Sequence, residues 1–215
     1  IIDGNERVVR ARLYDAKFFY DEDLKHPLEF YVDQLADVVF QEKLGTMLDK
    51  INRIKGLAQH LVEDAGLEAQ DSKDALRAAQ LCKADLVTSA VIEFTSVQGV
   101  MGSYYASACG ETDQVAQAIE QHYRPRFAGD EVPETAAGKV VALADKLDTI
   151  CGLFSVGQGP SGSSDPFALR RSAIGIVAML TCEHALSISL VSAINASLEL
   201  YAQAGIEFDH DAVRE

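Results

Sequence analysis

Charged residues follow a glycine-rich segment in the second half of the chain, and they suggest anion binding. Gly157–Gly162 spells GxGxxG, but it follows a helical pattern and no strand, so the match to a dinucleotide fingerprint is weak. Asp165 can cap a helix whose first turn contains Pro166. The loop amides could cradle an anion, although Asp165 opposes this and Arg170 and Arg171 would have to supply the attraction. Alternatively, the segment is a connector whose arginines pair with acids.

A second group of cations could contact nucleic acid. Tyr123–Phe127 interleaves aromatic and basic residues as a nucleic-acid surface does, and it equally fits a turn that ends a helix. Several lysines are ambiguous between solvated faces and contacts with a partner. They are Lys43, Lys83, Lys139 and Lys146.

Composition limits the classes of function. The chain has 215 residues and a formal charge of −14, so any contact with nucleic acid must come from local basic clusters. The four cysteines form no CxxC pair, which favours reduced structural thiols, and no apolar stretch is long enough to span a bilayer. The chain starts at Ile1 without a methionine, so we expect an excised piece of a longer polypeptide.

Apolar residues recur at helical spacing over most of the chain, whereas alternating runs typical of strands are scarce. The pattern predicts an all-α fold. Gly99 and Gly102 should lie on one side of a helix and let a neighbouring backbone approach. The expected helices cover Glu6–Leu24, Pro27–Phe40, Thr46–Ala65, Ser72–Phe94, Gln98–Ala108, Asp113–His122, Glu134–Phe154, Pro166–Leu180 and Ala185–Ala204.

Four runs of sequence carry a family resemblance, and they cover Phe40–Thr46, Lys83–Thr88, Val141–Thr149 and Gly162–Arg171. Together they resemble the β subunit of the bacterial two-subunit glycyl-tRNA synthetase, in the part built on a degenerate HD-type helical domain. The resemblance implies an HD-domain-like multi-helix bundle over residues 26–215, with its signature between about residues 30 and 171. Residues 1–25 would be the tail of a preceding domain or a leading helix.

An HD domain normally brings a histidine, a His-Asp pair and a further aspartate to one metal ion. On that pattern Arg53 stands where the first histidine would be, Ala84 replaces the second, and Asp85 and Asp145 are the surviving carboxylates. Because a guanidinium takes the place of the ion, we expect no metal and a buried or half-buried network that joins Arg53 to Asp85 and Asp145. His60 is expected to be a helix-end or surface histidine.

The resemblance implies the role of a subunit in a larger enzyme. In that enzyme the α subunit activates glycine with ATP and Mg²⁺, and the β subunit serves tRNA recognition and assembly. We therefore expect the α subunit and tRNA-Gly as partners, no DNA, no membrane, a cytoplasmic location, and neither a cofactor nor a catalytic residue in this chain. The candidate tRNA-binding residues are Lys43, Lys83, Lys146, Arg124, Arg126, Arg170 and Arg171.

Two alternatives stay open. A metal-dependent HD phosphohydrolase would need the imidazoles that Arg53 and Ala84 replace. A purely architectural helical module would share the fold but have no affinity for RNA, and the acidic charge of the chain favours it.

Overall fold

Helices dominate the fold. The computed structural model describes residues 2–208, and it confirms the predicted all-α, multi-helix architecture. Within these residues the strands are confined to an antiparallel pair, β1 (Val39–Gln41) and β2 (Gly45–Thr46). The α-helices are α1 (Ile2–Asp23), α2 (Met47–Asp64), α3 (Ala69–Leu81), α4 (Ser89–Glu93), α5 (Val100–Ala108), α6 (Asp113–Gln121), α7 (Ala136–Ser155), α8 (Leu169–Thr181) and α9 (Leu190–Gln203).

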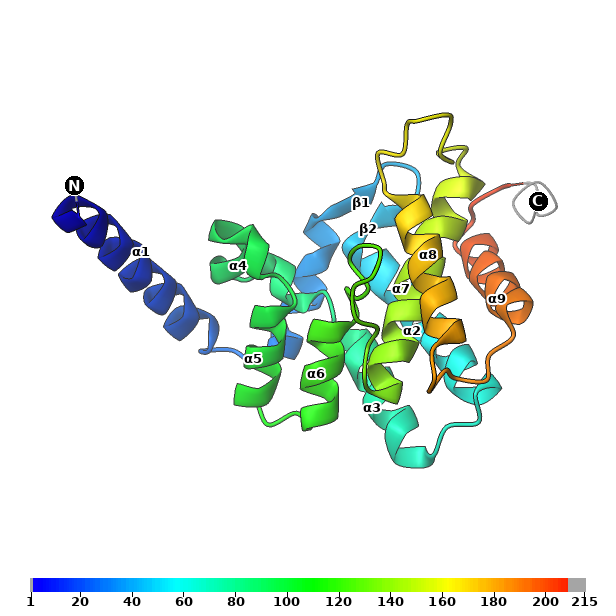
Figure 1. The fold of residues 1–215 in the computed structure, drawn as a ribbon, viewed down its shortest axis with the longest axis horizontal. Helices are drawn as coiled ribbons and strands as arrows, with labels where there is room; N and C mark the ends of the chain where they lie inside the picture. The colour runs from blue at the N-terminus through cyan, green and yellow to red at the C-terminus, as the bar shows by residue number, and fades with distance from the viewer. Residues whose placement is uncertain (1, 209–215) are drawn as a thin grey trace.

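The first helix, α1, extends away from the rest of the molecule (Figure 1). Its C-terminal end is anchored by Asp23, which is buried. The Asp23 carboxylate accepts the backbone N–H groups of Ser89 at 2.8 Å and Ala90 at 3.0 Å, and the hydroxyl of Tyr105 at 2.7 Å. Asp23 therefore satisfies the free amides at the start of α4 and ties α1 to the bundle. The domain boundary near residue 25 stays a prediction, and the last predicted domain residues, 209–215, lie outside the described part.

Helix α7 lies at the centre of the bundle and packs against α2, α3, α6, α8 and α9 (Figure 1). Apolar and small side chains surround most of its length, as expected for a helix buried on all sides. Thr135 caps its start by accepting the N–H of Gly138 at 2.9 Å. The charged residues Asp145, Lys146 and Asp148 are therefore carried into the interior by their positions on this helix.

Helix α2 faces α7 and begins with a capping box. The Thr46 hydroxyl accepts the N–H of Asp49 at 3.2 Å, and the Asp49 carboxylate accepts the N–H of Thr46 at 2.7 Å. Ile51, Ile54 and other apolar residues at helical spacing are fully buried. The same face brings Lys50 and Arg53 against α7.

Two predicted helices are wrong. The segment expected to be helical over Pro27–Phe40 instead forms the 3₁₀ helices η1 (Leu28–Tyr31) and η2 (Asp33–Asp37) and then β1. Gly45, with φ of +88°, returns the chain so that β2 pairs with β1. A short hairpin therefore replaces the last turn of the expected helix.

The predicted helix Ser72–Phe94 is broken after α3. The chain continues as η3 (Ala84–Val87) and α4, because the distant Asp23 carboxylate accepts the N–H groups of Ser89 and Ala90 that a continuous helix would use. The ends of α2, α5, α6 and α7 lie within two residues of expectation. The remaining helices are confirmed with shifted starts, since α1 begins four residues earlier than predicted and α8 and α9 begin three and five residues later. Over residues 2–208, no helix combines the length and apolar character needed to cross a bilayer.

Candidate functional site

A network of buried charges joins α2 to α7. Asp148, with only 1% of its surface exposed, pairs with Arg53 Nε at 2.7 Å and with Lys50 Nζ at 2.9 Å. The same Lys50 nitrogen lies 2.9 Å from Asp145 Oδ1. Arg53 also donates to the carbonyl of Leu44 at 3.1 Å. Lys50 therefore links the two carboxylates of α7.

The network continues to the end of α6. Lys83 Nζ lies 2.9 Å from Asp145 Oδ2 and donates to Nε2 of His122 at 2.7 Å. His122 is fully buried, and its Nδ1 lies 2.6 Å from the carbonyl of Ile119. These partners assign the neutral tautomer with the proton on Nδ1, because Nε2 must accept from an ammonium. The Lys83 ammonium also lies 4.0 Å from the centre of the Tyr123 ring.

Burial and opposite charges set the ionisation states in this network. Burial disfavours the charged form of Asp145, but Lys50 and Lys83 outweigh it and hold its pKa well below the usual range. Burial likewise opposes the charge of Lys83, and Asp145 more than compensates, so the pKa of Lys83 is raised. For His122, burial and the neighbouring Lys83 both lower the pKa well below 6.5. The network thus holds an ionised Asp145 and a charged Lys83 beside a neutral His122 imidazole.

The predicted ion-pair network is wrong in its partners. Arg53 pairs with Asp148, one turn beyond Asp145, and Asp145 pairs with Lys50 and Lys83. The difference follows from side-chain reach, since Lys50 occupies the position between Arg53 and Asp145. Ala84, at the position of the second HD histidine, is fully buried and belongs to the hydrophobic core.

Asp85 stands apart from this network. Its Oδ2 accepts the backbone N–H groups of Gly99 at 2.5 Å and Gly102 at 3.1 Å, at the start of α5. The close approach predicted at these glycines is made by side chains and not by a backbone. Gly102 faces Asp85 and Ile119, and Gly99, which precedes α5, faces the Tyr123 ring. Burial raises the pKa of Asp85 against the opposing effect of these amides. Asp85 is therefore a helix cap in this fold.

The donor set around Asp145 does not suit a metal ion. Its two carboxylate oxygens face the ammoniums of Lys50 and Lys83, which repel a cation. Among residues 2–208, no group of three or more His, Cys, Asp or Glu side chains is placed to hold a metal. His60, which was expected at a helix end or on the surface, is half-buried within α2. Its Nε2 lies 2.9 Å from the hydroxyl of Ser192. The ammoniums of Lys50 and Lys83 therefore lie beside Asp145, where the HD pattern would place a metal ion.

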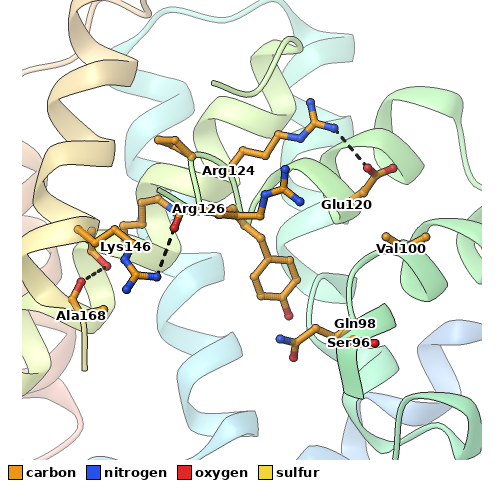
Figure 2. A pocket seen from close by; sticks show the side chains of 12 residues that line it. Ser96, Gln98, Val100, Glu120, Arg124, Arg126, Lys146 and Ala168 are labelled. Carbon is orange, nitrogen blue, oxygen red and sulfur yellow. Dashed lines mark hydrogen bonds and ion pairs between the residues drawn. The ribbon is translucent and has the colours of Figure 1, made fainter. Parts of the chain in front are cut away.

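A cleft of about 390 Å³ opens next to the buried network, and Figure 2 shows its side chains. It lies between the start of α5, the turn after α6, and helices α7 and α8. Arg124 and Arg126 come from the turn, with Lys146 and Ala168 on one wall and Gln98 on the other (Figure 2). The lining residues are Ser96, Gln98, Val100, Glu120, Tyr123, Arg124, Pro125, Arg126, Lys146, Ala168, Arg171 and Ser172. Four of the candidate tRNA-binding residues therefore share one cavity, and we call it the basic cleft.

Carboxylates neutralise only part of the basic cleft. Arg126 is paired with Asp130 at 2.9 Å. Arg124 contacts Glu120 at 3.4 Å and Glu131 at 3.3 Å. Lys146 and Arg171, the other two cations of the cleft, have no carboxylate within 4.0 Å among the described residues.

Lys146 and Arg171 contact backbone carbonyls of the turn. Lys146 Nζ is 3.4 Å from the carbonyl of Tyr123, and Arg171 Nη1 is 3.4 Å from the carbonyl of Arg126. Burial lowers the pKa of Lys146 to about 8, and Lys83 and Lys50 act in the same direction against Asp145. The basic cleft therefore carries positive charge that the fold leaves uncompensated.

The remaining candidate cations lie elsewhere. Lys83 is 5% exposed and its ammonium is held by Asp145, so it lies behind the cleft and does not line it. Lys43 borders separate hollows near β2 and α9. Arg170 donates to the carbonyl of Gly162 at 2.9 Å.

Asp165 caps α8, as predicted, although the helix begins later than expected. Its carboxylate accepts the N–H groups of Leu169 at 2.8 Å and Arg170 at 3.0 Å. Pro166 lies before the helix, which starts at Leu169, so its predicted place in the first turn is wrong. The capping carboxylate occupies the amides that an anion would need, and the loop itself offers no anion site there.

Sequence reasoning missed Lys50, His122 and Asp148. Helical spacing contains a signal for Lys50, which is three residues before Arg53 and so lies on the same face of α2. Asp148 similarly follows Asp145 by three residues on α7. No signal of this kind marks His122, because its partners come from other elements.

Comparison with known proteins identifies the family. A family model described as "Glycyl-tRNA synthetase beta subunit" matches residues 1–214. The chain is similar to the proteins named "Glycine--tRNA ligase beta subunit" from Shewanella sp. (strain W3-18-1) and Shewanella oneidensis, at 50% identity over 201 residues. The match covers 94% of this chain and 29% of each relative. The chain therefore belongs to the glycyl-tRNA synthetase beta subunit family.

Proposed function

We propose that this chain contributes tRNA positioning to a glycine–tRNA ligase, and that the basic cleft is its RNA-contacting surface. The relatives are named as beta subunits of that ligase, and the chain spans 29% of their length. The cleft supplies the local positive charge that a chain with a net charge of −14 needs for contact with a phosphate backbone. The observation that carries the proposal is the meeting of Arg124, Arg126, Lys146 and Arg171 in one cavity.

The side chains of the cleft suit a polyanion better than a small apolar ligand. Arginines suit phosphates because they offer planar, bidentate donors. Gln98 and Ser96 add neutral hydrogen-bonding groups to the opposite wall (Figure 2). Such groups can contact sugar or base edges while the cations hold the backbone.

The wider enzyme supplies the chemistry in this proposal. Its α subunit, with ATP and Mg²⁺, would activate glycine, and this chain would hold tRNA-Gly without a catalytic residue or cofactor of its own. The location would be the cytoplasm, where translation uses the product. The phosphohydrolase alternative is disfavoured because ammoniums of Lys50 and Lys83 face Asp145 where a metal would be held.

Charge reversal at the rim of the cleft tests the proposal. Arg124→Glu/Arg126→Glu should weaken binding of tRNA-Gly and reduce the slope of log affinity against log salt by about two, since each lost phosphate contact removes about one. Arg7→Glu/Arg10→Glu on α1 is the matched control, because it makes the same change in net charge at exposed positions. Equal affinities for the two double variants would leave the architectural role as the better explanation.

A further inference from the structure

Lys146 is a buried ammonium without an anionic partner of its own. It is 9% exposed, and its polar contact is a carbonyl at 3.4 Å. Gly175 of α8 makes room for its stem, since a Cβ there would come within 3.0 Å of Lys146 Cε. The fold therefore places this charge at the cleft at some cost in stability.

The surrounding network does not supply the missing negative charge. Its cations are Lys50, Arg53 and Lys83, whereas its carboxylates are Asp145 and Asp148, which leaves one positive charge in excess before Lys146 is counted. Burial, with Lys83 and Lys50, lowers the pKa of Lys146 to about 8 even though Asp145 opposes this. An anion in the cleft would reduce the imbalance.

Arg171 is the second donor available to such an anion. It lines the same cleft, and its guanidinium lies against the turn whose carbonyls contact Lys146. We propose that Lys146 and Arg171 form a subsite for one phosphate group, supplied by an RNA backbone or by a free phosphate. This inference rests on the proposed function of the basic cleft and assigns the position of one phosphate within it.

Free phosphate tests the subsite without RNA. At tenfold excess over its Kd, inorganic phosphate should raise the Tm of the chain by about 3 °C or more at constant ionic strength. Lys146→Met should abolish that rise. The variant should also melt at least about 3 °C above the wild type in phosphate-free buffer, because it removes an uncompensated buried charge.

Lys139→Met is the matched control. Lys139 is a buried lysine of the same helix, and its ammonium donates to the carbonyl of His184 at 2.7 Å, outside the cleft. This variant should keep the phosphate-dependent rise in Tm. A rise that survives Lys146→Met, or a Tm of that variant at or below the wild-type value, would overturn the subsite.

A second arm uses tRNA-Gly and separates the two proposals. Lys146→Met and Arg171→Met should each weaken tRNA binding about tenfold or more and lower the salt slope by about one. If both variants bind tRNA like the wild type while Arg124→Glu/Arg126→Glu does not, the cleft proposal stands and the phosphate response decides the subsite. A response that Lys146→Met abolishes then assigns the subsite to free phosphate, whereas a response that survives overturns it. If none of these variants changes tRNA binding, the cleft proposal fails, and so does the subsite as a site for an RNA phosphate.

Discussion

Asp148→Asn should destabilise the protein strongly, although Asp148 is placed in no binding role. The substitution keeps the size of the side chain but removes the charge that balances Arg53 and Lys50, at 2.7 Å and 2.9 Å. Breaking a buried ion pair from one side costs about 3–5 kcal/mol, because the remaining charge stays desolvated. For a chain of this size, a loss of that order lowers Tm by roughly 6–20 °C.

Thermal and urea unfolding followed by circular dichroism would measure this loss. Asp21→Asn is the surface control, since Asp21 pairs with Lys17 on α1 with more than half of its side chain exposed. That change should stay within about 0.5 kcal/mol. In the Asp148→Asn background, Arg53→Met should cost less than it does in the wild type, because the pair is already broken. A loss under about 1 kcal/mol for Asp148→Asn, or equal costs of Arg53→Met in both backgrounds, would refute the reasoning.

Two further predictions concern packing and pH. Gly102→Ala should destabilise the fold by about 1–3 kcal/mol, because the new Cβ would lie 2.8 Å from Ile119 Cγ2 and 3.1 Å from the Asp85 carboxylate. Gly4→Ala, with no atom within 4 Å of the new methyl group, should not destabilise it, and urea unfolding of both variants provides the comparison. Acid should also weaken the fold: the pKa of His122 is lowered in the folded state, so the unfolded chain binds this proton first as pH falls below about 6.5. The free energy of unfolding should drop by about 2 kcal/mol between pH 7.5 and 5 through this group, with the low pKa of Asp145 adding a loss below about pH 4. His122→Gln should flatten the change between pH 7.5 and 5, whereas a profile unchanged from that of the control His184→Gln would contradict the assignment.

The sequence predicted the position of a helix well where a recognisable cap is followed by apolar residues at regular helical spacing. Thr46 and Asp49 form a capping box that is readable from sequence, and the apolar spacing of α2 continues from it. One of the two wrong helices fails where a distant residue intervenes, and the other fails at a short local hairpin. Asp23 takes the amides at the start of α4, and the pairing of β1 with β2 replaces a helical turn.

The residue types of the HD pattern predicted a buried group of charges without a metal. They did not predict which charged side chains pair with each other. Arg53 was expected to face Asp145 and pairs with Asp148, because Lys50 fills the space between. A shift of three residues along a helix turns a side chain by about 60° and moves it by about 4.5 Å, so Asp145 and Asp148 stay on the same side of α7. Sequence spacing therefore cannot choose between two carboxylates one turn apart.

Sequence by itself determined the all-α class, the family and the presence of isolated basic residues in an acidic chain. These depend on periodicity, composition and local motifs, which are properties of short stretches. Only the tertiary structure decided that Lys83 is buried behind the cleft while Lys146 and Arg171 line it. The physical reason is that exposure and charge compensation depend on which elements pack together, and the cleft is lined by residues that range from Ser96 to Ser172.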